Sequence, residues 1–189
     1  MIKMIIESPH TGKKPKIHES AFIAPNTVII GDVEIGEGAN IWFGAIIRGD
    51  WGGIKIGKYT SIQENVTIHI ELAKDAIIGD NCIVGHHAMI HGPCEIGNGC
   101  LIGIGANVLA NSKLGDGCLL AGGAVLTNKE IPPRKLVVGI PANVKKDLSD
   151  KGPLVAHANS MGYYENGQKF KKFFEEHDKD VNGIPIYRS

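Results

Sequence analysis

Residues 84–108 of the chain read VGHHAMIHGPCEIGNGCLIGIGANV. An aliphatic residue stands at every sixth position of this stretch: Val84, Ile90, Ile96, Ile102 and Val108. An α-helix would space its apolar residues by three and four, and a single strand would alternate them, so neither element explains the pattern. A six-residue repeat with one aliphatic residue per unit is the signature of a parallel β-helix.

The repeat extends in both directions, from Ile23 to Val144, with longer gaps before Ile56 and Ile78. Because each coil of such a helix has three short faces, one turn takes about eighteen residues and the repeat accounts for about seven coils. Rungs stacked at ~4.8 Å give a prism roughly 30–35 Å tall. The sequence therefore predicts a mainly β protein, a parallel β-helix of about seven triangular coils.

Two appendages flank the predicted prism. Residues 1–13 are expected to form a short strand and a turn that cap its open end, since repeat proteins protect their terminal edges. Gly152–Pro153 breaks the chain before an α-helix predicted over 154–176, whose apolar side would consist of Phe170, Phe173 and Phe174. The predicted organisation is a hexapeptide-repeat β-helix domain at 1–148 and a C-terminal helix and tail at 149–189, packed on the β-helix.

The residue after each aliphatic lies at a corner of the coil, where the sequence usually places glycine, as a tight turn favours. Large polar residues replace glycine at four corners: Arg48, Gln63, His69 and His91. Departures from a scaffold's own preference are expected at functional sites.

Column counting places these residues relative to one another. Arg48, His69 and His91 are one coil apart once insertions of three and four residues are allowed for, so they are predicted to stack on one corner. Glu64 and His86 form a second column on the neighbouring corner. His86 and His91 would be roughly 16 Å apart along an extended chain, whereas zinc–nitrogen bonds are only about 2.0–2.1 Å. The spacing therefore predicts a metal site shared between subunits.

Three imidazoles with an open fourth position are the arrangement of a catalytic zinc site. Zn²⁺ is the expected ion, and Fe²⁺ or Co²⁺ remain alternatives because imidazole suits several metals. The competing interpretation is a histidine-lined interface without metal.

Four motifs together resemble the γ-class carbonic anhydrases and their relatives over residues 14–148. They are RGD at 48–50, QEN at 63–65, His69, and GHHAMIHG at 85–92. The resemblance implies a left-handed β-helix and a homotrimer with three interfacial metal sites. His69 and His91 would come from one subunit and His86 from its neighbour.

The resemblance also implies a function, the reversible hydration of carbon dioxide to bicarbonate by a metal-bound hydroxide. A metal ion lowers the pKa of bound water to about 7. Gln63 would hydrogen-bond the bound water or the substrate, and Asp50 would orient Gln63. Arg48 would pair with an acidic residue across the interface, with Glu64 as the natural partner. Tyr163 resembles a helix tyrosine that reaches the site in some relatives.

The sequence departs from the best-studied members of that family in ways that bear on activity. Trp51 follows RGD in place of an acidic residue, and the loop after His69 is the short IELAKD, in which Glu71 is the nearest substitute for a proton-exporting carboxylate. The motif QEN replaces the usual QDN. Fast hydration requires proton export, so slow or absent turnover is an open alternative.

Two further alternatives remain at this stage. A CoA-dependent hexapeptide acyltransferase would use one histidine as a general base and no metal. A non-catalytic trimeric relative, or one acting in coenzyme A or carnitine metabolism, would keep the scaffold alone. In either case Arg48, Asp50 and Glu64 would form only an interface ion-pair network, which is worth little at a surface.

Composition sets limits on partners. The formal net charge is zero, so no basic footprint predicts nucleic acid or an anionic membrane as a partner. No secretory or membrane-spanning segment is visible, and a cytoplasmic protein is expected. The four cysteines occupy the small inward position of the repeat and are expected to fill the core as free thiols.

Overall fold

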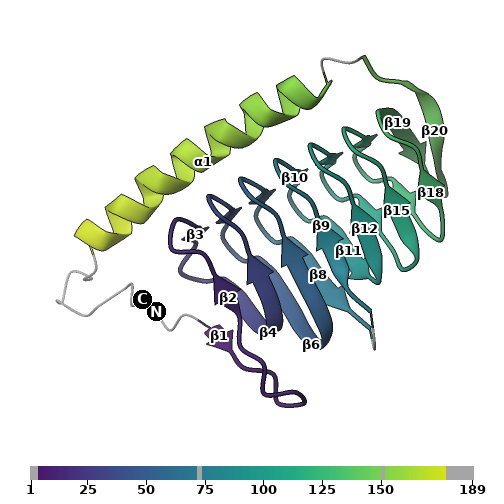
Figure 1. Ribbon diagram of the computed structural model, residues 1–189. Coiled ribbons are helices and arrows are strands. Elements are labelled where there is room, and N and C mark those ends of the chain that lie inside the picture. The colour runs from purple at the N-terminus through teal and green to yellow at the C-terminus, as the bar shows by residue number, and fades with distance from the viewer. Residues whose placement is uncertain (1–3, 72–73, 150–151, 178–189) are drawn as a thin grey trace.

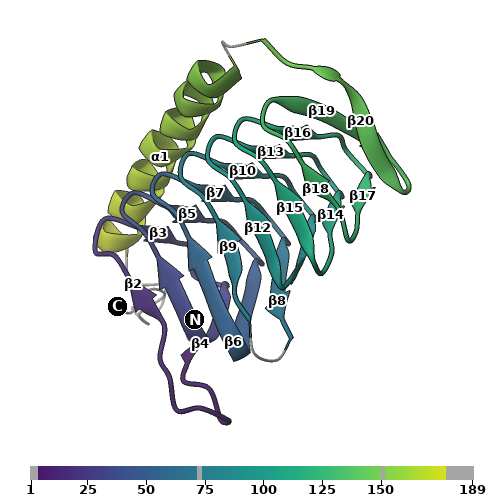
Figure 2. The ribbon, with the colours of Figure 1, turned by 45° about the vertical axis from the view of Figure 1, so that its right-hand side comes forward.

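The structure is a computed structural model that describes residues 4–71, 74–149 and 152–177, so the predicted tail after His177 lies outside it. The chain forms a parallel β-helix of about seven turns, and one helix, α1 (Gly152–Glu176), lies along its side (Figures 1 and 2). The strands stack into three faces. The predicted mainly β fold with a C-terminal helix is confirmed.

The first face, which we call the helix-covered face, lies beneath α1. Its parallel strands are β3 (Phe22–Ile23), β5 (Asn40–Ile41), β7 (Ser61–Ile62), β10 (Ile83–Val84), β13 (Leu101–Ile102), β16 (Leu119–Leu120) and β19 (Lys135–Gly139). The last strand, β20 (Ala142–Asp147), pairs antiparallel with β19 and ends the stack.

The two remaining faces share the long strands β4 (Val28–Ile35) and β6 (Ile46–Ile56), which pass around the corner between them. The histidine face consists of the first halves of these strands with β1 (Met4–Ile6), β8 (Thr67–Ile70), β11 (Met89–Gly92), β14 (Asn107–Val108) and β17 (Val125–Leu126). The charged face consists of their second halves with β2 (Lys16–Ile17), β9 (Ala76–Ile78), β12 (Cys94–Ile96), β15 (Ser112–Leu114) and β18 (Glu130–Ile131).

The repeat residues point inward, as predicted. Ile47, Ile68 and Ile90 are fully buried on successive coils of the histidine face, and burying such a side chain contributes about 1.5–3 kcal/mol. The four cysteines are buried and free. Burial raises the pKa of the Cys94 thiol to about 12, so this thiol stays protonated near neutral pH.

Helix α1 packs on the first coils through an aromatic cluster. Phe170 and Phe174 contact Trp42 and Phe43, and Gln168 Nε2 donates to the Ser20 carbonyl at 2.9 Å. The helix begins two residues before the predicted start. The prediction for Phe173 was wrong: its side chain is 51% exposed and stacks on the His177 ring, because it lies on the outer side of the helix.

The N-terminal segment behaves as an added rung. Strand β1 pairs in parallel with β4, so that Met4 lies beside Val28, and β2 pairs with the second half of β4. The segment therefore covers the first coil, as expected of a cap.

Candidate metal centre

Arg48, His69 and His91 occupy adjacent rungs at the end of the histidine face. Their backbones are direct partners in the strand pairs β6–β8 and β8–β11, which confirms the predicted column. The imidazole rings of His69 and His91 have centroids 5.5 Å apart and are inclined at 73°. Two histidines of one chain thus lie side by side on this edge, which we call the His69/His91 edge.

The His69 ring is oriented by the backbone of the coil before it. Its Nδ1 lies 3.0 Å from the Arg48 carbonyl oxygen. A carbonyl only accepts, so Nδ1–H donates and Nε2 keeps its lone pair. Metal-ligating histidines are commonly oriented in this way. In the isolated chain the Arg48 Nη2 group lies 3.1 Å from that Nε2, so a metal ion on His69 requires the guanidinium to move aside.

Asp50 forms an ion pair with Arg48 within the chain. Its Oδ2 accepts from Arg48 Nη1 at 2.7 Å, and the Asp50 side chain is only 8% exposed. The second oxygen, Oδ1, is buried without a hydrogen-bond partner among the described residues, and it lies 3.9 Å from His69 Nδ1, beyond hydrogen-bond distance. An acceptor of this kind is available to a donor from a neighbouring chain.

The N-terminal segment contacts the part of β6 that carries Asp50. Ser8 Oγ donates to the Asp50 carbonyl at 3.1 Å in a buried position. The Trp51 ring packs against His10 at a centroid distance of 4.5 Å and remains 46% exposed. Trp51, which follows the RGD motif directly in β6, therefore leaves part of its apolar ring open to solvent.

Among the described residues, Glu71 is the only one whose carboxylate lies within 4 Å of a His91 ring nitrogen. Its Oε1 lies 3.9 Å from His91 Nε2, and its side chain is 66% exposed. The distance is too long for a hydrogen bond, but the exposed carboxylate can exchange protons with solvent.

The opposite edge of the histidine face carries His86, and we call it the His86 edge. His86 Nδ1 lies 2.7 Å from Glu64 Oε2. The carboxylate accepts, so Nδ1–H donates and Nε2 is again left with its lone pair. Glu64, expected to pair with Arg48 across an interface, is bound within the chain to the histidine of its own column.

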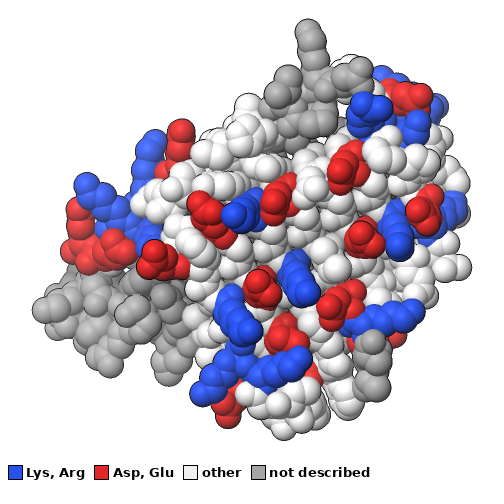
Figure 3. Space-filling model, viewed as in Figure 1, with Lys and Arg blue, Asp and Glu red and all other residues white. Residues whose placement is uncertain are grey.

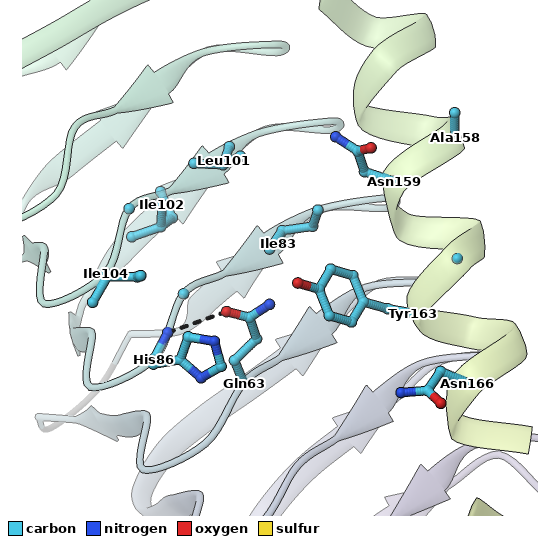
Figure 4. Close-up of a pocket in the computed structure, with 13 residues that line it drawn as sticks. Gln63, Ile83, His86, Leu101, Ile102, Ile104, Ala158, Asn159, Tyr163 and Asn166 are labelled. Atoms are coloured by element: carbon cyan, nitrogen blue, oxygen red, sulfur yellow. Dashed lines mark hydrogen bonds between the residues drawn. The ribbon is translucent and has the colours of Figure 1, made fainter. Parts of the chain in front are cut away.

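Gln63 lies beneath His86. Its side chain is buried, and its Oε1 accepts from the His86 backbone N–H at 3.2 Å. Figure 4 shows the Tyr163 hydroxyl directed from α1 toward Gln63. Gln63, His86 and Tyr163 therefore belong to one edge, whereas Asp50 belongs to the other, so Asp50 could orient a glutamine only across a contact between chains.

One chain does not assemble the three-histidine site. Within residues 4–71, 74–149 and 152–177, no three His, Cys, Asp or Glu side chains converge as metal ligands. His69 and His91 nevertheless lie on one edge and His86 on the other. Nδ1 of His69 and of His86 is hydrogen-bonded within the chain, and Nε2 of His69 lies 3.1 Å from Arg48 Nη2. These residues fit a divalent ion held between two chains.

A carbonic anhydrase from Geobacillus kaustophilus is 38% identical over 163 residues, which cover 86% of this chain and 90% of the relative. The chain belongs to the γ-class carbonic anhydrase-like family. Residues 14–49 and 93–128 of this family member also match the bacterial transferase hexapeptide family.

Two other matches mark the breadth of the carbonic anhydrase-like family. The crystal structure of a hexapeptide transferase family protein from Anaplasma phagocytophilum superimposes with a TM-score of 0.83 at 32% identity, covering 90% of this chain and 99% of that one. Gamma carbonic anhydrase 2 of Arabidopsis thaliana, a mitochondrial protein, is 32% identical over 94% of this chain. The chain spans 33% to 65% of the length of three such Arabidopsis proteins.

Sequence reasoning missed one part of the site. Asn159 and Asn166 lie beside Tyr163 along α1 and line the same pocket. Their spacing of four and three residues from Tyr163, which places them on one side of a helix, was the available signal.

In the described part of the chain, no helix combines the length and apolar character that crossing a bilayer requires.

Proposed function

We propose that the protein is a metal-dependent γ-type carbonic anhydrase that hydrates carbon dioxide reversibly at sites between the subunits of a homotrimer. The observation that carries the proposal is the pair of oriented imidazoles. His69 and His86 each have Nδ1 engaged, by a carbonyl and by a carboxylate. Nε2 of His86 is left for a metal ion, and Nε2 of His69 becomes available once the Arg48 guanidinium, 3.1 Å away, moves aside. Zn²⁺ is the ion we expect, with Fe²⁺ or Co²⁺ as alternatives.

The three faces differ in what they offer to a second chain. Helix α1 lies over the first face, and lysines alternate with acidic residues on the charged face (Figure 3). The outward residues of the histidine face are mostly apolar, and Ile46 is 43% exposed. If three histidine faces turn toward a common axis, the His86 edge of each chain meets the His69/His91 edge of the next. Such a heterologous contact closes into a ring.

His69, His86 and His91 would hold the divalent ion, whose chemistry would be to acidify a water molecule and so supply a nucleophile for carbon dioxide. The chain's own residues would orient and desolvate the reactants. The Gln63 Nε2 group and the Tyr163 hydroxyl face the pocket beside His86 and can hydrogen-bond an oxygen atom there. Arg48 would leave His69 Nε2 and turn toward the neighbouring chain, while Asp50 keeps it near the seam.

The direct test is metal analysis of protein purified without chelator, combined with stopped-flow measurement of carbon dioxide hydration. We expect about one zinc ion per chain, in line with three sites per trimer, and hydration that chelation abolishes. A stable monomer, or a trimer that binds no zinc, iron or cobalt, would contradict the proposal. Metal binding without hydration would leave the non-catalytic relative as the better description.

A CoA-dependent acyltransferase is the second candidate, because the Anaplasma relative belongs to the hexapeptide transferase family. That chemistry uses one histidine as a general base and leaves the engaged Nδ1 atoms of two histidines unexplained. Acetyl transfer from acetyl-CoA by metal-free protein would favour it. A cytoplasmic location stays a prediction. The Arabidopsis relative is named a mitochondrial protein, so the location of the relatives does not test it.

A further inference from the structure

Strand β1 adds one rung to the histidine face, beside the first half of β4 (Figure 1). Met4 is in register with Val28, which begins the outward ladder of this face. Ile6 is in register with Ile30, and the partner of Ile30 on β6 is Arg48. The two outer residues of β1 therefore continue the two outward columns of the histidine face, and the column of Ile6 leads to the His69/His91 edge.

All three residues of β1 are apolar and exposed in the single chain. Met4, Ile5 and Ile6 have exposed fractions of 46%, 39% and 42%. Ile5 is in register with the fully buried Ile29, so it belongs to the inward column and closes the end of the core. Neighbouring residues of a strand point to opposite sides, so Met4 and Ile6 point out of the histidine face. Closing the end of the core explains an apolar residue at Ile5 and gives no reason for the other two.

Strand β2 adds the corresponding rung to the charged face and provides a matched comparison. Its outward residue, Lys16, is exposed and in register with Glu34. A terminal rung that meets water carries a polar outer face. The N-terminal rung is therefore polar where it extends the charged face and apolar where it extends the histidine face. Its outer residues follow the face to which they belong.

The apolar outer side of β1 needs a cover. An exposed hydrophobic strand at the end of a sheet invites association with other chains, and exposed apolar patches mark sites of protein contact. Register indicates which contact this is. The column of Ile6 passes through Arg48 to His69 three rungs away, roughly 14 Å at the usual strand spacing. The same surface therefore runs without a break from β1 to the edge that we propose to meet a second copy of the chain.

We propose that β1 is part of the contact between subunits, with Met4 and Ile6 of each chain packed against the neighbouring chain. The inference rests on the proposed trimer and extends its seam from the metal site to the N-terminal rung. The partner is a second copy of this chain. Because the contact is apolar and lies away from the histidines, it stabilises the assembly whether or not a metal ion is bound.

Thiol labelling of the assembled, full-length protein tests the proposal without adding a charge. The four native cysteines are buried, so a single introduced cysteine reports its own access to a thiol reagent. Ile6→Cys should react about tenfold or more slowly than Lys16→Cys, its counterpart on β2, because its reaction requires the seam to open. Rates measured in denaturant provide the reference for each variant. Equal rates in the assembled protein would overturn the proposal.

Charges on β1 test its part in assembly. The double variant Met4→Lys, Ile6→Lys should raise the concentration at which the trimer dissociates at least about tenfold, because the contact would bury two unpaired charges. Lys16→Glu, a charge reversal at the same end of the prism, should leave that concentration unchanged. Mass photometry of a dilution series measures it, and circular dichroism verifies the fold. An unchanged dissociation concentration in the double variant, or loss only of species larger than a trimer, would overturn the proposal.

Zinc content and a chelator-treated sample separate this proposal from the proposed metal site. A trimer that binds no zinc but dissociates in the double variant would support the role of β1 and disprove the metal site alone. A zinc-loaded trimer that is insensitive to both lysines would disprove the role of β1 alone.

Discussion

The histidine face and the charged face differ in what their outward residues offer. On the charged face, residues in register run from coil to coil with alternating charge, interrupted by one isoleucine: Lys16, Glu34, Lys55, Ile77, Glu95, Lys113 and Glu130. On the histidine face the equivalent ladder carries almost no charge: Val28, Ile46, Thr67, Met89, Asn107 and Val125.

The inward residues of both faces are the same kind of aliphatic column. The β-helix fold therefore requires neither the charged outward residues of one face nor the uncharged outward residues of the other. Alternating charges keep a face hydrated and allow neighbouring rungs to pair, as Lys113 and Glu95 do at 3.4 Å. A largely apolar ladder bounded on both edges by histidines is suited to the contact with another chain that we propose. The outward residues of each face, rather than the inward ones, therefore distinguish a solvated surface from a candidate interface.

The largest effect should follow removal of a ligand from the histidine face. His91→Ala takes away one of three imidazoles, and we expect loss of bound zinc and of any hydration activity. Elemental analysis of the folded variant measures it. The control is His177→Ala, at the end of α1, which should keep the wild-type zinc content. Full zinc stoichiometry in His91→Ala would refute the ligand assignment.

A charge placed on each face tests which one is the interface. Ile46 and Ile77 are isoleucines in outward positions with similar exposed fractions, 43% and 38%, on the histidine and the charged face respectively. Ile46→Lys should dissociate the trimer, because it would bury an unpaired charge. Ile77→Lys should leave the trimer intact. Light scattering coupled to size-exclusion chromatography gives the mass, and the opposite outcome would assign the interface to the charged face.

A smaller effect is expected from the residue that orients His86. Glu64→Gln removes the carboxylate 2.7 Å from His86 Nδ1, and loss of such an outer-shell partner typically lowers metal affinity 10–100-fold. Competition with a fluorescent zinc chelator measures the affinity. Glu95→Gln, on the charged face, is the matched control and should bind zinc as wild type does. If Glu64→Gln matches that control, Glu64 does not orient the ligand.

The smallest effect belongs to the charged ladder itself. Lys113→Ala breaks an ion pair whose side chains are 58% and 57% exposed, and such pairs are worth about 0–1 kcal/mol. We expect the free energy of unfolding in urea to change by no more than about 1 kcal/mol, with trimer mass and zinc content unchanged. A loss of the trimer in this variant would show that the charged face also takes part in assembly.

The sequence predicted the scaffold because the six-residue period records which side chains point inward. It also predicted the stacking of Arg48, His69 and His91, since insertions can be counted along the chain. It could not predict the partner of Glu64, because whether a carboxylate reaches the histidine of its own column depends on side-chain conformation. The exposure of Phe173 and the pocket beneath α1 depend on how the helix lies on the prism, which no repeat encodes.

The shared metal site is tested most directly by mixing two variants that each lack part of it. One chain carries His86→Ala and the other carries both His69→Ala and His91→Ala, so neither homotrimer has a complete site. After refolding together, every mixed trimer contains one seam with all three histidines, and random assembly should restore about a quarter of the wild-type zinc content. The account predicts that restoration. No zinc in the mixture, or full zinc in either variant alone, would contradict it.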